Sequence, residues 1–304
     1  MKVSVAFITY NHEPFVAQAL ESALMQEGVE FEIVVGEDRS TDRTREIVAG
    51  YAERHPGRVR LLPTPCNLGM HRNAERTLGA CGGEYVALLE GDDYWTAPDK
   101  LRKQVERLDR APGDALCFHD VLVVYEDGRP PHPFRGDGSK TVFTVEELAA
   151  ENFIPTCSAM LRNRPRIPYP GWLLRMPMLD WPLFLLCAER GGIAYLTERM
   201  GAYRVHGGGI WASLDRVDVL ETSLLASRMI RKNLGGRYGE AMDRSVSRWH
   251  YEIARILSDG KKPARAVRHA VKSFAACPFH PDLPKGALRG ILRKALFPGS
   301  RGAG

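Results

Sequence analysis

The first 120 residues alternate short apolar runs with amphipathic segments, and this alternation leaves few possible folds. Predicted strands cover residues 3–8, 31–36, 59–62, 85–89 and 116–125. Predicted helices cover about 15–24, 41–55, 72–81 and 96–110, the last capped by Thr96. Short β-branched runs that alternate with helical periodicity are typical of a parallel sheet with helices on both faces. We therefore predict an α/β fold built on a doubly wound, mostly parallel sheet.

Polar clusters follow the first four predicted strands. They are Thr9-Tyr10-Asn11, Glu37-Asp38-Arg39-Ser40, Asn67-Leu68-Gly69 and Glu90-Gly91-Asp92-Asp93. In doubly wound sheets, ligands bind beyond the carboxyl ends of the strands. We therefore expect the four clusters to converge at one edge of the sheet.

The second half of the chain is less regular. Residues 126–150 have the composition of a loop, and strands are predicted over 154–161 and 194–196, with a helix over 179–190 between them. From about Ser213 the pattern is helical, with two helical stripes separated at Asp259-Gly260. We therefore predict a sheet domain over residues 1–212, made of halves 1–120 and 121–212, and a helical region over 213–304.

Positive charge is concentrated at the C-terminus. The net charge is +5, and from Arg244 onward there are 13 basic but only three acidic side chains. A solvated helical face would explain this excess, as would peripheral contact with the inner face of a membrane. Nucleic acid is not an expected partner, because no aromatic residues interleave the basic ones. Neither a spanning segment nor paired CxxC cysteines are found, so we predict a cytoplasmic protein with reduced cysteines.

The acidic cluster Glu90-Gly91-Asp92-Asp93 is the strongest candidate for a metal site. Three carboxylates within four residues repel one another, and a divalent cation would relieve that repulsion. Oxygen ligands suit Mg²⁺ or Mn²⁺, which also bridge phosphate oxygens. A solvated turn before a helix would account for the same acids without a metal.

Four motifs, in this order and spacing, resemble those of family 2 glycosyltransferases of the GT-A fold. They are Phe7-Ile8-Thr9-Tyr10-Asn11, the stretch from Gly36 to Asp42, Asn67-Leu68-Gly69, and the stretch from Leu89 to Trp95. Asp180-Trp181 and Tyr203-Arg204-Val205-His206 extend the resemblance to about residue 210. Two departures stand out: Glu90 occupies the first position of the family's DxD motif, and Arg39 replaces a small residue.

The resemblance implies a role for individual residues. The nucleotide would be met by Thr9, Tyr10, Asn11, Glu37, Asp38, Asn67, Gly69 and Asp92, with Arg72 or Arg76 as a further contact. The metal would be held by Asp93, Asp92, Glu90 and His206, and the diphosphate would be met by Arg204 and His206. Asp180 would be the catalytic base, and a carboxylate in an apolar stretch is a good one because burial raises its pKa.

The function implied is that of an inverting, metal-dependent glycosyltransferase. The donor would be a nucleotide-diphosphate sugar, with UDP as the expected nucleotide, and Mg²⁺ or Mn²⁺ the cofactor. The acceptor would be a carbohydrate or a lipid-linked molecule, in envelope polysaccharide or glycoconjugate synthesis. Two alternatives stay open: a non-catalytic scaffold that keeps this fold, and a nucleotidyltransferase, which would usually have a glycine-rich phosphate loop after the first strand.

Overall fold

The computed structural model describes residues 1–136, 140–209, 214–260, 262–283 and 286–296. The chain forms two compact units. One comprises residues 1–145 and 153–207, and the other comprises 146–152 and 208–304. The predicted domain boundary at residue 212 and the predicted start of the helical region at Ser213 lie outside the described residues.

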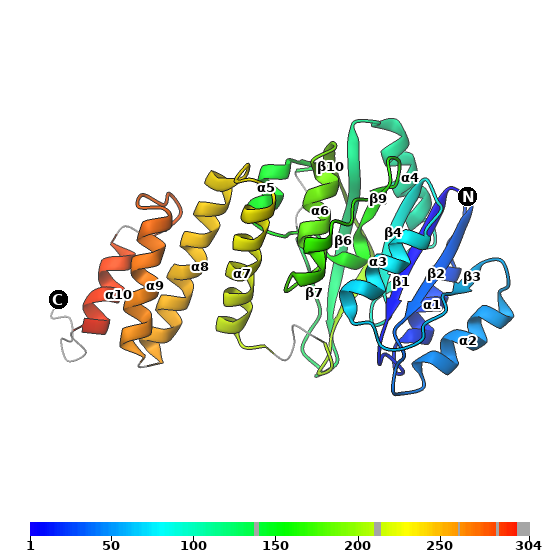
Figure 1. Ribbon diagram of the computed structural model, residues 1–304, viewed down its shortest axis with the longest axis horizontal. Coiled ribbons are helices and arrows are strands. Elements are labelled where there is room, and N and C mark those ends of the chain that lie inside the picture. The colour runs from blue at the N-terminus through cyan, green and yellow to red at the C-terminus, as the bar shows by residue number, and fades with distance from the viewer. Residues whose placement is uncertain (137–139, 210–213, 261, 284–285, 297–304) are drawn as a thin grey trace. The chain divides into compact units, whose positions relative to one another are not determined.

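A single mixed sheet organises the first unit (Figure 1). Its strands lie in the order β3-β2-β1-β4-β9-β6-β10-β5, with β7 paired to β6 and β8 paired to β10. The parallel strands at one side are β1 (Val3–Thr9), β2 (Phe31–Glu37), β3 (Val59–Leu61) and β4 (Tyr85–Glu90). The remaining strands are β5 (Tyr94–Trp95), β6 (Asp114–Tyr125), β7 (His132–Pro133), β8 (Val142–Phe143), β9 (Met160–Arg162) and β10 (Gly192–Val205).

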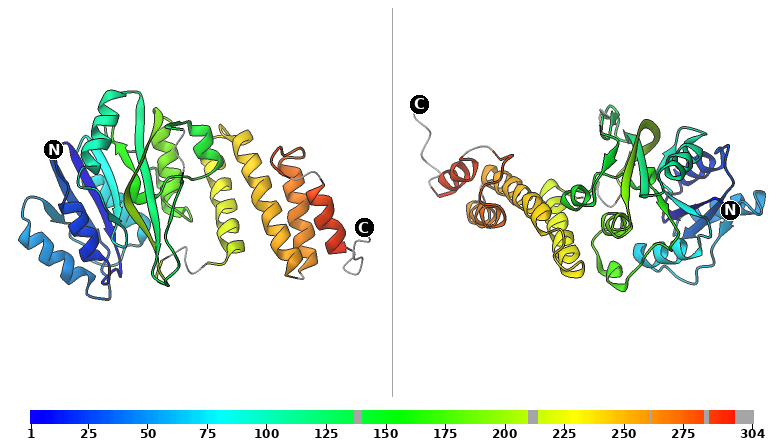
Figure 2. Two further views of the ribbon diagram at one scale, coloured as in Figure 1. Left: turned by 180° about the vertical axis from the view of Figure 1, so that it is seen from behind. Right: turned by 90° about the horizontal axis from the view of Figure 1, so that it is seen from above.

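Helices cover both faces of this sheet, as the alternating pattern predicts (Figure 2). On one face, α1 (Val16–Leu24), α2 (Thr44–Arg54) and α4 (Lys100–Arg110) share an apolar core with alternate residues of the central strands, such as Val5, Phe7 and Ile33. The opposite face carries α3 (Met70–Ala80) and α6 (Asp180–Ala188). The predicted doubly wound α/β architecture is therefore confirmed.

The structure departs from the predicted elements in several places. Residues 94 and 95 form β5, which pairs with β10, so α4 starts at Lys100 rather than being capped by Thr96. The predicted strand over 154–161 contains a 3₁₀ turn (η1, Thr156–Ser158), and only its last two residues belong to the short β9. A second 3₁₀ turn, η2, covers Gly171–Arg175, and the predicted loop over 126–150 contains β7, β8 and the helix α5 (Val145–Ala150).

Strand β10 is much longer than predicted. It runs for 14 residues, and register shifts against β6 occur around the exposed Thr197–Arg199 segment. Register shifts of this kind turn side chains outward and bend a strand. The polar run therefore interrupts the apolar pattern without ending the strand, which continues to Val205, directly before His206.

The second unit is helical. Its main elements are α7 (Arg216–Asn233), α8 (Gly239–Asp259), α9 (Pro263–Ala276) and α10 (Ala287–Leu296). The helical hairpin predicted around Asp259-Gly260 is α8 with α9, which pack side by side (Figures 1 and 2). Throughout the described residues, no helix combines the length and the hydropathy needed to span a membrane.

Lys100 is fully buried in the core of the first unit. Its Nζ lies 3.7 Å from the centre of the Trp95 ring, and none of the described residues accepts a hydrogen bond from it. Burial lowers the pKa of Lys100 to about 7, against an ordinary value of 10.5.

This burial makes stability depend on pH. Between about pH 7 and 10 the unfolded chain binds the Lys100 proton and the folded chain does not, so the free energy of unfolding should rise with pH. The expected slope is up to about 1.4 kcal/mol per pH unit. Lys100→Met, which keeps the volume, should remove this slope and stabilise the protein at pH 7. Urea unfolding of both proteins across this range is the measurement, and an equal slope in the two would contradict the prediction.

Candidate active site

The register of the sheet brings the ends of three strands to one edge. Thr9, the last residue of β1, lies opposite Glu37 at the end of β2, and Ile8 lies opposite Glu90 at the end of β4. The backbone N–H of Asp38 donates to Thr9 O over 3.1 Å, and that of Gly91 donates to Ile8 O over 2.9 Å. The polar clusters therefore meet at the carboxyl edge of the sheet, as their sequence positions predict.

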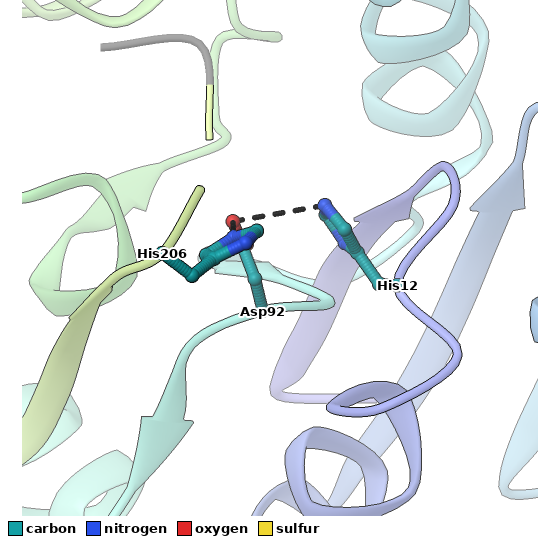
Figure 3. Close-up of side chains that lie close together, drawn as sticks. All are labelled: His12, Asp92 and His206. Atoms are coloured by element: carbon teal, nitrogen blue, oxygen red, sulfur yellow. Dashed lines mark hydrogen bonds and ion pairs between the residues drawn. The ribbon is translucent and has the colours of Figure 1, made fainter. Parts of the chain in front are cut away.

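Asp92 lies at the centre of a cluster with two histidines (Figure 3). Its Oδ2 is 3.1 Å from Nε2 of His206 and 3.6 Å from Nε2 of His12. His12 comes from the loop after β1, Asp92 from the turn after β4, and His206 from the residue after β10. One ligand atom from each residue lies within 4.8 Å of the others, and across the described residues no further His, Cys, Asp or Glu completes such a group.

The surroundings of His12 fix its ring in this position. Its Nδ1 lies 3.3 Å from Thr9 Oγ1, which leaves Nε2 facing Asp92. A second partner on the far ring nitrogen is the usual arrangement for a histidine that binds a metal. Gly91 leaves the necessary space, since a Cβ there would lie 2.3 Å from Thr9 Oγ1 and 2.9 Å from His12 Nδ1.

The protonation of this cluster is set by burial and by its neighbours. Burial alone would raise the pKa of Asp92, but the hydrogen bond with His206 and the nearby His12 lower it below its ordinary value. Burial lowers the pKa of His12. An ionised carboxylate and a neutral imidazole are the forms in which these side chains bind a metal.

Further carboxylates surround Asp92. Burial raises the pKa of Glu90 well above its ordinary value, and repulsion by Asp92, Asp93 and Asp180 adds to the effect. Burial, followed by repulsion from Asp92, likewise raises the pKa of Asp93. Asp180, half-buried at the start of α6, is therefore within electrostatic reach of the acidic turn. A cation among these groups would relieve their mutual repulsion.

Asp93 and Arg204 hold the acidic turn against β10. Asp93 is 2% exposed, and its Oδ1 accepts the backbone N–H of Arg204 over 2.8 Å. The guanidinium of Arg204 donates to Asp92 O over 2.8 Å, to Gln18 and to Glu126. Neither Asp93 nor Glu90 belongs to the His12–Asp92–His206 group. The guanidinium donors of Arg204 are therefore all used within the fold, one of them on the backbone of Asp92.

Glu37 is enclosed at the end of β2. Its Oε1 accepts the Ser40 N–H over 2.6 Å, and its Oε2 pairs with Arg45 over 2.7 Å. Burial would raise the pKa of Glu37, but these hydrogen bonds lower it overall. Arg39, directly before Ser40, has a φ of 58°, a left-handed conformation that favours glycine. This explains why the motif usually has a small residue at this position.

Asp38, Asn67 and Gly69 form one network. The two carboxylate oxygens of Asp38 accept the N–H groups of Leu68 and Gly69 over 2.8 and 2.9 Å. Asn67 donates its amide to Asp38 O and accepts from Gly69 N. Gly69 has a φ of 80°, a conformation that suits glycine. This network shapes the loop that leads into α3.

Other predicted nucleotide contacts differ in exposure. Tyr10 is 41% exposed, whereas Asn11 uses its Oδ1 to accept the N–H of Thr41 over 2.8 Å. Arg76 donates to Glu37 O, Pro63 O and Asn73. Arg72 is exposed in the first turn of α3 and, among the described residues, has no hydrogen-bond or ion-pair partner. Of the two arginines, Arg72 is the one available to a ligand.

His12 is the functional candidate that the sequence reasoning missed. It follows the Thr9-Tyr10-Asn11 cluster directly, but nothing in its local pattern distinguishes a ligand from a loop residue. The only available signal was its place beyond the end of a strand, at the edge where Asp92 and His206 were expected.

Comparisons with known proteins identify the family of this chain. The family model described as "Glycosyl transferase family 2" matches residues 4–164. An uncharacterised protein of Mycobacterium tuberculosis is 38% identical over 91% of this chain and 80% of its own length. The succinoglycan biosynthesis protein ExoO of Rhizobium meliloti is 38% identical over 99% of this chain and 90% of its own.

Two solved structures share the fold. S. aureus TarS in complex with UDP-GlcNAc superposes with a TM-score of 0.64 at 20% identity, over 97% of this chain and 87% of its own. The mannosyltransferase PcManGT of Pyrobaculum calidifontis, in complex with GDP-Man and Mn²⁺, gives 0.53 at 16% identity, over 98% and 88%. The fold is thus of the GT-A type. With motifs, sheet topology and family model in agreement, the chain belongs to glycosyltransferase family 2.

Proposed function

We propose that this glycosyltransferase moves a sugar from a nucleotide-diphosphate sugar, with UDP as its nucleotide, to an acceptor hydroxyl. The observation that carries the proposal is the His12–Asp92–His206 cluster, which lies at the carboxyl edge of the sheet within a ring of carboxylates. The complex of TarS with UDP-GlcNAc supports the choice of a UDP-sugar.

The cluster suits a divalent cation. Its donor set is two imidazole nitrogens and one carboxylate oxygen, with His12 joining the Asp92 and His206 that the motifs suggested as ligands. Imidazole ligands favour transition metals over Mg²⁺, so Mn²⁺ is the cation we propose first and Mg²⁺ the second. The Mn²⁺ in the PcManGT complex supports this choice. When bound, the cation would neutralise charge that develops on the departing diphosphate.

The residues in and around the cluster have separate roles in proton transfer, cation binding and positioning of the acidic turn. Asp180 accepts the proton of the acceptor hydroxyl as that oxygen attacks the anomeric carbon from the face opposite the diphosphate, so the configuration inverts. Asp92, His12 and His206 would hold the cation, while Asp93 and Arg204 position the turn that carries Asp92. Glu90 supplies a further carboxylate beside them.

The nucleotide would lie along the ends of β1 to β3. Tyr10 is exposed there, and Arg72 offers an unpaired cation to the phosphates. The loops that face the nucleotide are shaped by the side chains and backbone of Thr9, Asn11, Glu37, Asp38, Asn67 and Gly69. We propose a carbohydrate or lipid-linked acceptor in polysaccharide synthesis, which the name of the Rhizobium relative supports.

Thermal unfolding with a panel of nucleotides tests this proposal. UDP or a UDP-sugar with Mn²⁺ should stabilise the protein by about 2.7 kcal/mol when present at 100 times its dissociation constant. A chelator should remove most of that shift, and GDP should give a smaller one. If no nucleotide stabilises the protein with any divalent cation, the transferase proposal fails and a non-catalytic scaffold becomes the better account.

A further inference from the structure

In the second unit, one face of α7 and one face of α9 line a common cavity. Its volume is about 330 Å³, at the lower end of the range for small-molecule sites. On α9 the lining residues are Arg265, Arg268, His269 and Lys272, and on α7 they are Glu221, Leu224, Leu225 and Arg228. Both sets follow the spacing i, i+3, i+4, i+7, which places each on one face of its helix.

Most of the charge in this cavity is positive and lacks a partner. Arg265 pairs with Glu221 over 3.2 Å. Arg228, Arg268 and Lys272 form no hydrogen bond or ion pair with any residue that the structure describes. Lys272 is half-buried, and burial lowers its pKa, with repulsion from Arg268 and Arg228 adding to the effect. Like charges held together in this way are destabilising unless an anion joins them.

Two buried histidines form the inner wall. His250 of α8 and His269 of α9 are 3% and 7% exposed, and their Nδ1 atoms lie 3.0 Å apart. Burial, and then repulsion by His269, Lys272 and Arg228, lowers the pKa of His250 to about 3. These rings are therefore neutral at ordinary pH and add no charge. One of them uses its single N–H in the Nδ1–Nδ1 hydrogen bond, so the other keeps an N–H for a ligand.

We propose that this cavity binds a phosphate or diphosphate group. Three unpaired cations on two rigid helices, with imidazole groups behind them, match the several oxygens and the negative charge of such a group. Arginine is well suited to it, since its planar fork can donate two hydrogen bonds to one phosphate. This site is separate in sequence from the residues proposed for sugar transfer, and it goes beyond that function.

Calorimetric titration of the full chain with inorganic pyrophosphate tests the proposal. The double variant Arg268→Ala/Lys272→Ala should bind it at least about tenfold more weakly, because charge-assisted hydrogen bonds are lost. Arg289→Ala/Arg293→Ala removes the same charge from exposed positions on α10 and should leave the affinity unchanged. Equal weakening in both pairs, or no pyrophosphate binding by the unaltered protein, would overturn the site.

The melting temperature of each variant, measured without anion, shows whether a loss of binding is caused by misfolding. Removing mutually repelling cations should leave it unchanged or raise it in Arg268→Ala/Lys272→Ala. A marked fall would show that these side chains stabilise the fold, which contradicts the proposal.

Vesicle sedimentation then distinguishes the source of the phosphate. Phosphatidylcholine vesicles with and without phosphatidic acid are the probes. Binding that needs phosphatidic acid and is lost in the same variant supports a lipid head group, whereas pyrophosphate binding without vesicle binding supports a soluble phosphate ester.

Discussion

Asp92→Asn is expected to lower kcat/KM by about 10²- to 10³-fold or more, because it removes the one carboxylate that both His12 and His206 face. Asparagine keeps the shape of the side chain and can still accept a hydrogen bond, so the turn should stay folded. The lost charge should also weaken Mn²⁺ binding by at least about tenfold. Electron paramagnetic resonance titration of Mn²⁺ measures this separately from catalysis.

A matched control is Asp127→Asn, which makes the same chemical change in an exposed turn where Asp127 pairs with Arg129. It should leave both Mn²⁺ binding and turnover unaltered. Full Mn²⁺ affinity in Asp92→Asn would show that the cation is held elsewhere, and Glu90 and Asp93 would then become the candidates again.

Asp180→Asn should lower kcat by roughly 10²- to 10⁴-fold, the range for loss of a positioned general base. The substitution should change the affinity for the donor sugar nucleotide only slightly, because Asp180 is assigned to the acceptor hydroxyl and not to the nucleotide. Stabilisation by the UDP-sugar with Mn²⁺ should therefore match that of the unaltered protein. This separation of turnover from donor binding is the mark that distinguishes Asp180 from Asp92.

Comparison with Asp180→Glu sharpens the test. Glutamate keeps the carboxylate but moves it by one methylene, so part of the activity should return in that variant. If Asp180→Asn loses the thermal shift as well as turnover, the residue supports the donor site or the start of α6 instead, and the base must be sought elsewhere.

The local pattern of the first 120 residues determined most of the fold. Apolar runs such as 3–8 and 85–89 are typical of strands buried on both faces, and the amphipathic segments between them are typical of helices buried on one face. Each element can therefore be predicted from a short stretch of sequence. Parallel strands then put Thr9, Glu37 and Glu90 at one edge whatever the details of packing. Local periodicity was enough for that inference, and the family motifs strengthened it.

The roles of individual residues at that edge needed the tertiary structure. Both carboxylate oxygens of Asp38 accept hydrogen bonds from backbone N–H groups. The guanidinium of Arg204 donates to Asp92 O, Gln18 and Glu126. A sequence shows which groups carry charge, but not which partners have already satisfied them. For that reason the nucleotide and diphosphate contacts predicted from motifs include residues that serve the loops themselves.

What the sequence alone determined is therefore the sheet, the edge at which the candidate site lies and the helical C-terminal region. The motifs suggested Asp92 and His206 as ligands of one metal, but only the tertiary structure decided that His12 joins them and how they meet. His206 is 114 residues from Asp92 and arrives on a strand whose register shifts twice near Arg199. The periodicity of apolar residues over a few helical turns is enough to predict which face of a helix is buried. Contacts between distant segments depend on the length and bends of the strands that carry them, which no local window records.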